Sequence, residues 1–79
     1  MKIKILFFAG IKEALGQSHR LMEVTDGTSI HEVVQWLGHE SAVFQKMPLV
    51  FAVNENFETE GRELKDQDQL AIMTPMSGG

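Results

Sequence analysis

The sequence has 79 residues, with 7 lysines and arginines against 11 aspartates and glutamates, and its formal net charge is −4. A chain of this length forms one small domain with a single core, here expected over residues 1–79. It has no cysteine for a disulfide, and its three scattered histidines make a poor metal site. The acidic balance argues against a nucleic acid partner, and no apolar run approaches the roughly 20 residues that span a membrane. We therefore expect a soluble, cytoplasmic domain without a metal.

The first predicted elements are a strand, a short helix and a second strand. In residues 2–8, KIKILFF, every second side chain is isoleucine or phenylalanine, which is typical of a strand with one buried side. Residues 9–16, AGIKEALG, predict one or two helical turns that end at Gly16, since glycine accepts the left-handed conformation that follows a helix. Residues 18–24, SHRLMEV, predict the second strand, although their pattern does not indicate which side is buried.

The main helix is predicted to start after Ser29. Ser29 and Glu32 have the spacing of a capping box, in which each side chain satisfies a backbone amide of the other. Apolar residues then recur at helical spacing, namely Ile30, Val33, Val34 and Leu37. Gly38 is the expected end of the helix. This single apolar stripe predicts a helix that lies across a sheet.

Further strands are predicted after Pro48. Residues 49–54, LVFAVN, are apolar on both sides, which favours a well-covered strand. A short edge strand is expected around residues 57–59, and the polar turn LKDQDQ leads into a last strand, LAIM, at residues 70–73. The order of elements predicts an α+β domain with one helix packed on a single sheet.

Four segments together resemble a known family: LFFA at residues 6–9, KEALG at residues 12–16, VN at residues 53–54, and LKDQDQLAIMTPMSGG at residues 64–79. In a chain of this size, they are similar to the small subunit of molybdopterin synthase, a ubiquitin-like β-grasp sulfur carrier. The resemblance implies a mixed sheet of four to five strands, with the last strand parallel to the first and one main helix on one face. It also implies a flexible C-terminal tail at residues 75–79.

Three residues depart from the family pattern. Gln67 stands where the family usually has glycine between the two aspartates, Gln69 where it usually has glutamate, and Thr74 where proline often precedes Pro75. A glycine suits a positive backbone angle, so Gln67 predicts either backbone strain or a different turn.

The tail ends with Gly78 and Gly79. A carboxylate is a poor electrophile until another enzyme activates it, and this chain has no glycine-rich loop for binding the phosphates of ATP. Because glycines have no β-carbon, Gly78 gives a partner access to Gly79 through a narrow channel. The resemblance implies that an E1-like adenylating enzyme uses ATP to activate Gly79, that the adenylate becomes a thiocarboxylate, and that the sulfur is delivered inside the large subunit of the synthase. The chain itself is then a non-catalytic carrier that binds no cofactor.

A docking surface is expected beside this tail. If the last strand lies beside the first, Met73 shares the outer face of the sheet with Phe8, and Phe57 joins them from the neighbouring hairpin. An apolar patch at the start of the tail is where a partner would grip the domain. The expected partner-binding residues are Phe8, Phe57 and Met73, with Leu6 and Ala71 beside them, followed by Pro75, Met76 and Ser77 in the tail.

Other functions remain open at this point. The same carrier chemistry can serve thiamine synthesis or tRNA thiolation, or the chain can be a ubiquitin-like modifier that is conjugated to lysines. The opening LFFAGIKEALG favours the molybdopterin pathway. From a different class, the domain can be a passive β-grasp interaction module whose glycines are inert.

Overall fold

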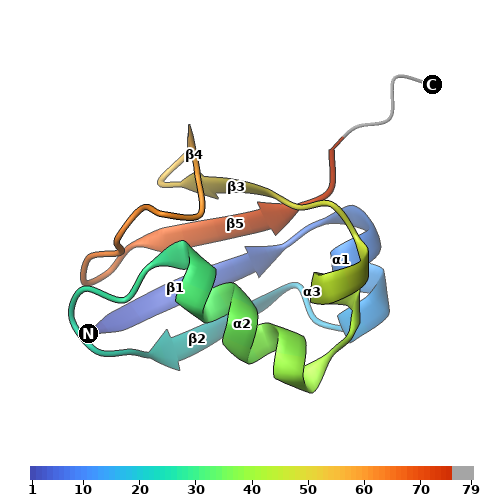
Figure 1. The fold of residues 1–79 in the computed structure, drawn as a ribbon, viewed down its shortest axis with the longest axis horizontal. Helices are drawn as coiled ribbons and strands as arrows, with labels where there is room; N and C mark the ends of the chain where they lie inside the picture. Colours follow the sequence, from blue (N-terminus) through green and yellow to red (C-terminus); the bar gives the residue numbers. More distant parts are fainter. Residues whose placement is uncertain (76–79) are drawn as a thin grey trace.

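The computed structural model describes residues 1–75 of the chain. Figure 1 shows one sheet with the longest helix lying across one of its faces. In chain order the elements are β1 (Lys2–Phe7), α1 (Ala9–Leu15), β2 (His19–Glu23), α2 (Ile30–Glu40), α3 (Val43–Lys46), β3 (Val50–Val53), β4 (Asn56–Glu58) and β5 (Gln69–Met73). The predicted α+β class is confirmed.

The sheet has five strands in the order β2-β1-β5-β3-β4. Strand β5 is parallel to β1, with Phe7 opposite Ile72, and the other neighbouring strands are antiparallel. The first and last strands therefore lie side by side within the sheet (Figure 1), which confirms the mixed arrangement. Because β5 lies inside the sheet, the chain leaves for its C-terminal tail from between β1 and β3.

The core lies between the sheet and α2. The alternation along β1 and β5 turns every second side chain toward the helix, and the stripe of α2 faces back. The most deeply buried of these side chains are Ile3, Ile5, Phe7, Leu70 and Ile72 from the sheet and Ile30, Val33 and Leu37 from α2. Each such side chain stabilises the fold by about 1.5–3 kcal/mol through burial. The opposite face of the sheet is left as an open face.

Helix α2 begins as predicted but does not end at Gly38. Ser29 Oγ accepts the Glu32 N–H at 3.2 Å, and Glu32 Oε1 accepts the Ser29 N–H at 3.3 Å, which forms the capping box. The helix continues to Glu40, so the expected end was wrong. Gly38 is instead a packing position, because an added Cβ would lie 3.2 Å from Gln45 Nε2, which also donates to the Gly38 carbonyl at 3.0 Å.

The remaining differences from the predicted elements are small. Helix α3 follows α2 and was not predicted. The hairpin between β3 and β4 turns at Asn54 and Glu55, both with positive φ, of 50° and 74°. These angles suit a tight two-residue hairpin turn, so β3 ends at Val53 and β4 starts earlier than expected, at Asn56. Within residues 1–75, no helix has the length and apolar character needed to cross a membrane.

Candidate functional site: the open face at the start of the tail

The start of the tail is the described part of the predicted site. After β5, Thr74 is half-buried and Pro75 is exposed, so the chain leaves the sheet at this point. The predictions for Met76, Ser77, Gly78 and Gly79 lie outside the described residues. The structure does describe the surface around the C-terminal end of β5, where the tail begins.

One row of side chains crosses the open face at this end. Leu6 is opposite Ala71, Ala71 is opposite Ala52, and Ala52 is opposite Phe57, so the row runs over β1, β5, β3 and β4. Phe57 is 75% exposed at the edge strand. The two alanines are short, so the phenylalanine and the leucine flank a low apolar strip. The structure thus places Phe57 on the face where it was predicted.

A second row lies nearer the tail. Phe8 has extended backbone angles and donates its N–H to the Ile72 carbonyl at 3.2 Å, so the alternation of β1 continues and its side chain joins the open face. It is 45% exposed. Met73 is half-buried and is paired with Val50 of β3. The residues of both rows form the candidate surface for binding a partner, which we call the docking surface: Leu6, Phe8, Val50, Ala52, Phe57, Ala71 and Met73.

Sequence reasoning missed Val50 and Ala52 of this docking surface. Their signal was present, since LVFAVN is apolar on both sides, but the alternation alone does not tell which residues face the helix. The pairing of Phe51 with buried Ile72 turns Phe51 inward and its two neighbours outward. The docking surface is therefore more continuous than the predicted patch and carries no charged side chain among its seven members.

The VN and D-x-D motifs meet at the opposite end of β5. Asn54 Nδ2 donates to Asp68 Oδ1 at 2.9 Å, and Asn54 Oδ1 accepts the Gln69 N–H at 3.0 Å. Asp68 is only 5% exposed, and its second oxygen accepts the Lys65 N–H at 2.8 Å. Both oxygens of this buried carboxylate therefore have donors. The two motifs fasten the β3–β4 turn to the start of β5 and act on the fold, away from the tail.

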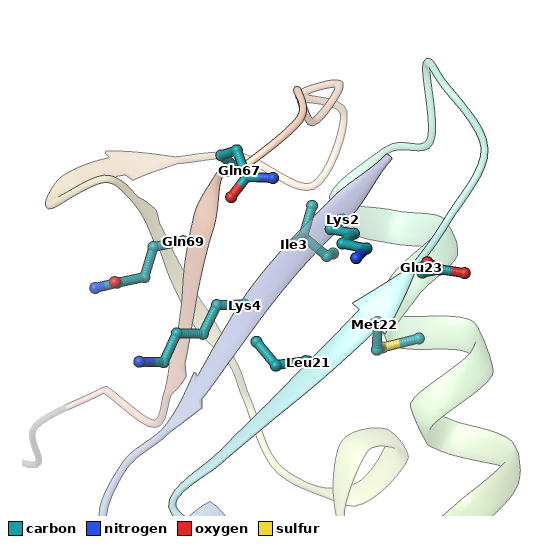
Figure 2. Close-up of a pocket in the computed structure, with 8 residues that line it drawn as sticks. All are labelled: Lys2, Ile3, Lys4, Leu21, Met22, Glu23, Gln67 and Gln69. Carbon is teal, nitrogen blue, oxygen red and sulfur yellow. The ribbon is translucent and has the colours of Figure 1, made fainter.

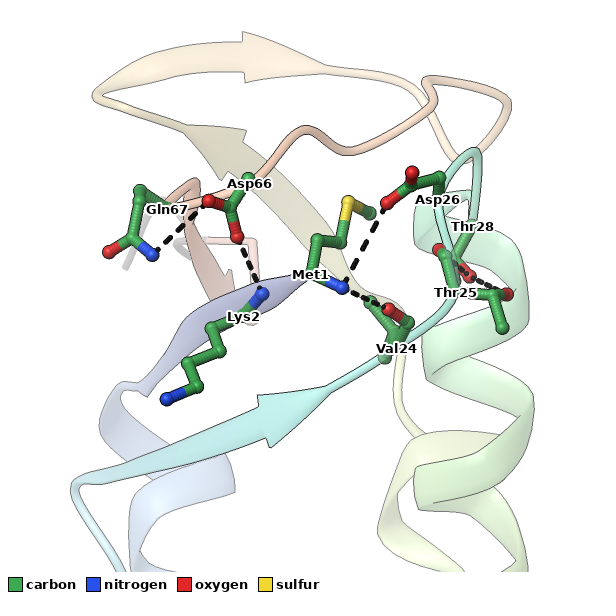
Figure 3. A network of polar contacts seen from close by, with 8 residues as sticks. All are labelled: Met1, Lys2, Val24, Thr25, Asp26, Thr28, Asp66 and Gln67. Carbon is green, nitrogen blue, oxygen red and sulfur yellow. Dashed lines mark hydrogen bonds and ion pairs between the residues drawn. The ribbon is translucent and has the colours of Figure 1, made fainter.

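The turn before β5 is also bonded to the start of β1 (Figure 3). Asp66 Oδ1 accepts the Lys2 N–H at 2.7 Å, and Gln67 donates its own N–H to the Lys2 carbonyl at 2.7 Å. The Lys2 N–H, with a weaker contribution from the Gln67 side chain, lowers the pKa of the Asp66 carboxyl. Gln67 has a φ of 70°, so the turn keeps the geometry that suits glycine, and of the two predicted alternatives backbone strain is confirmed.

A shallow hollow of about 490 Å³ lies on the open face at this end, remote from the tail. Figure 2 shows Leu21, Lys4 and Gln69 extending from three adjacent strands around it. Leu21 is 75% exposed although it is a large apolar side chain. The hollow is lined by Lys2, Ile3, Lys4, Leu21, Met22, Glu23, Gln67 and Gln69.

Several polar side chains that could serve as metal ligands or nucleophiles in the described residues make other contacts. Within residues 1–75, no group of three or more histidine, cysteine, aspartate or glutamate side chains could hold a metal ion. His31 Nδ1 instead contacts Glu60 Oε2 at 2.9 Å on the surface. Ser29 caps α2, and Ser18 Oγ lies 3.1 Å from Nδ1 of the adjacent, exposed His19.

The sequence profile of the ThiS family matches residues 5–79. The chain belongs to the ThiS family. A curated relative of this ThiS-family chain, the molybdopterin synthase sulfur carrier subunit of Chlamydomonas reinhardtii, is 31% identical to it over 100% of both chains. The resemblance to the small subunit of molybdopterin synthase is thereby confirmed.

Solved structures show the same fold. The putative molybdopterin converting factor subunit 1 of Pyrococcus furiosus has a TM-score of 0.85 at 20% identity, covering 96% of this ThiS-family chain and 99% of its own. A chain in the complex of subunits 1 and 2 of molybdopterin-converting factor from Helicobacter pylori has a TM-score of 0.72 at 21% identity, covering 100% of both chains. The ubiquitin of Caldiarchaeum subterraneum reaches 0.63 at 21% identity, covering 100% of this chain and 98% of its own. The predicted ubiquitin-like β-grasp is confirmed.

Proposed function

We propose that this chain is a sulfur carrier in molybdenum cofactor synthesis and acts as the small subunit of a molybdopterin synthase. The observation that carries the proposal is the family match through residue 79, together with end-to-end similarity to a curated sulfur carrier subunit. Both alignments include the Gly78-Gly79 pair, the part of the sequence with a chemical use in a carrier. The chain would carry and present the sulfur, while the partners supply catalysis.

The proposed chemistry takes place at Gly79. An E1-like partner binds ATP, and the Gly79 carboxylate attacks the α-phosphate, which releases pyrophosphate and leaves an acyl-adenylate. A sulfur nucleophile at the sulfide level, hydrosulfide released from a donor, then adds to the acyl carbon and AMP leaves, so that the carboxylate becomes a thiocarboxylate. Gly78 supports both steps because its lack of a side chain keeps the acyl carbon accessible.

The proposed partner for the docking surface is the large subunit of the synthase. The H. pylori structure with the same fold is a complex of subunits 1 and 2 of molybdopterin-converting factor, which motivates this choice. The apolar docking surface ends at Met73, two residues before Pro75, so a partner that covers it is well placed to receive the tail. We propose that Phe8, Phe57 and Met73 bind this subunit, with Pro75, Met76 and Ser77 leading the tail into it.

The proposal is tested by the mass of the intact chain. The purified protein is incubated with ATP, a sulfur donor and an activating enzyme from the same cell. A mass gain that equals the exchange of one oxygen for sulfur is expected, and a chain without Gly79 should show none. The variant Leu21→Ala, at an exposed position outside the docking surface, is the matched control and should gain the same mass as the wild-type chain.

The outcomes also separate the competing functions. Covalent conjugates of Gly79 with lysines of other proteins would indicate a ubiquitin-like modifier. A thiocarboxylate that passes its sulfur to a thiamine precursor or to tRNA would place the same chemistry in another pathway. No mass gain, while a known carrier reacts in parallel, would indicate a passive module and contradict the proposal.

A further inference from the structure

Strand β2 is an edge strand, with β1 as its neighbour in the sheet. At its two ends, Val24 donates its N–H to the Met1 carbonyl and Phe7 donates its N–H to the Ser18 carbonyl, both at 2.9 Å. In an antiparallel ladder every second residue exchanges hydrogen bonds with its neighbour, and the residues between them direct their backbone groups outward. With this register, the β2 residues whose N–H and C=O groups point away from β1 are His19, Leu21 and Glu23.

The same three residues place their side chains on the open face. Figure 2 shows Leu21 and Glu23 on β2, with Lys4 on the adjacent strand. Leu21 is 75% exposed, and on this face it lies between the exposed side chains of His19 and Glu23. A free edge is a template for another strand and is usually protected by proline, a bulge or charged side chains, above all lysine. Strand β2 has no proline, bulge or lysine. Its two charged residues are Glu23, which faces His19 of a second copy in the pairing proposed below, and Arg20, which is half-buried and paired with Glu40 of α2 at 2.6 Å. With five residues β2 is longer than the three-residue edge strand β4.

We propose that two copies of this chain associate through antiparallel pairing of β2 with β2, centred on Leu21. Around that centre Leu21 faces Leu21 of the second copy, and His19 faces Glu23 on either side. Because all three residues have outward backbone groups, each facing pair exchanges both of its N–H···O=C bonds. The contact is isologous, as a closed two-fold dimer requires.

The second copy fits this edge because β2 complements itself. Pairing covers two exposed leucines with each other, and it brings the His19 imidazole, a hydrogen-bond donor, beside the Glu23 carboxylate twice. No other partner chemistry is needed to satisfy the three outward residues. The resulting ten-stranded sheet leaves β5 and the docking surface uncovered, since β1 separates β2 from β5.

The dimer has to be weak and sensitive to charge. The contact is a short strand pair, well below the area of a stable interface, and each copy has a net charge of −4. Over protein concentrations from about 10 μM to about 1 mM, we therefore expect dimers to form toward the upper end. Association should be stronger at higher salt, because salt screens the repulsion between the two acidic copies. Sedimentation of the full chain alone, without any partner, measures this directly and does not depend on the sulfur chemistry.

The first test compares two variants with the same change of charge. Leu21→Lys places two ammonium groups opposite each other and should raise the dimer Kd by about tenfold or more. Phe57→Lys adds the same charge at an equally exposed position on the opposite edge and should leave the Kd within about twofold of wild type. A wild-type chain that stays monomeric throughout the range, or a dimer that Leu21→Lys leaves unchanged, overturns the proposal.

The second test addresses the register. His19→Glu places carboxylates opposite Glu23 and should weaken the dimer, whereas adding Glu23→Lys to that variant should restore it. The chain has no natural cysteine. Oxidation of a Leu21→Cys variant can therefore form a disulfide only between the introduced cysteines of two copies. Facing residues of a strand pair lie about 5.5 Å apart at Cα, within the range for a disulfide. Rapid cross-linking is expected relative to Glu13→Cys, an exposed site on α1. Equal rates for the two, or no rescue by the charge swap, would show that the pairing is wrong.

Discussion

Replacing Gln67 with glycine is expected to stabilise the domain. The φ of Gln67 is 70°, a region in which the Cβ of an ordinary residue crowds the following carbonyl oxygen. The side chain is exposed, and its hydrogen bond from Nε2 to Asp66 Oδ2 is long, at 3.4 Å. The two stronger bonds of this turn use the Gln67 backbone N–H and the Asp66 carboxylate, which glycine at position 67 leaves in place.

The expected magnitude follows from two opposing terms. The left-handed conformation costs a residue with a Cβ about 1–2 kcal/mol, which glycine avoids. Glycine also gives the unfolded chain more freedom, which offsets about 0.4–1 kcal/mol of that gain. The two terms together leave a gain of about 0–1.6 kcal/mol, so the free energy of unfolding of Gln67→Gly is expected to rise by about 0.8 kcal/mol. For a domain of this size, that central value corresponds to an increase in Tm of about 3–6 °C.

Thermal unfolding followed by circular dichroism measures the shift. Gln67→Ala keeps the Cβ and should remain within about 0.5 kcal/mol of wild type. Lys65→Gly is the matched control in the same turn, because Lys65 is exposed and has no positive φ; it should lose about 0.5–1 kcal/mol. The reasoning is refuted if Gln67→Gly unfolds at or below the wild-type temperature, or if the glycines at both positions have the same effect.

Three further changes test the motifs and the docking surface. Asn54→Ala removes the donor to buried Asp68 and should lower the free energy of unfolding by about 1–3 kcal/mol in a denaturant titration. Asp66→Asn should be less stable than wild type at about pH 7, and the gap should close in acid, because a carboxyl with a lowered pKa stabilises the fold above its unfolded pKa and loses that effect as the pH falls through its folded pKa. Phe8→Ala should weaken binding to the large subunit by about 10- to 100-fold in calorimetry, while Leu21→Ala, also exposed but outside the docking surface, should not.

For each of these three variants, a different outcome would contradict the expected one. An Asn54→Ala variant as stable as wild type would mean that Asp68 does not depend on its amide partner. A stability gap for Asp66→Asn that widens in acid would contradict the assigned sign of the pKa shift. Equal losses of affinity for the Phe8 and Leu21 variants would mean that the partner covers the whole open face and not the docking surface alone.

The sequence predicted those helices and strands that are determined by interactions between residues close together in the chain. The capping box at Ser29 and Glu32 satisfies amides within one helical turn, so its outcome does not depend on the rest of the fold. The strand β1 was likewise predicted from a local pattern, since alternation of apolar side chains arises whenever one side of a strand is buried. The interpretation of Gly38 as the helix end was wrong for a non-local reason, because Gly38 packs against the Gln45 side chain, which donates to its carbonyl, and the helix continues past it. That contact belongs to α3, which sequence reasoning did not predict.

Some residues of the docking surface could be predicted from the sequence, and others could be assigned only from the strand register. Phe8 and Met73 were placed together because parallel pairing of the last strand with the first follows from the β-grasp. Val50 and Ala52 could not be assigned, since both sides of their strand are apolar and only the register with β5 decides which side is open. For Gln67 the sequence left two turn geometries, and the choice became visible only in the backbone angle. The outward groups of β2 likewise follow from its register with β1.

The most direct test of sulfur carriage is the fate of the sulfur once the chain is loaded. The thiocarboxylated protein is mixed with purified large subunit and the sulfur-free precursor of molybdopterin, and the mass of the chain is followed over time. We predict that the chain returns to the mass of its carboxylate as product forms, and that Phe8→Ala slows this return at limiting large subunit. A thiocarboxylate that persists beside an active large subunit would contradict the proposed function.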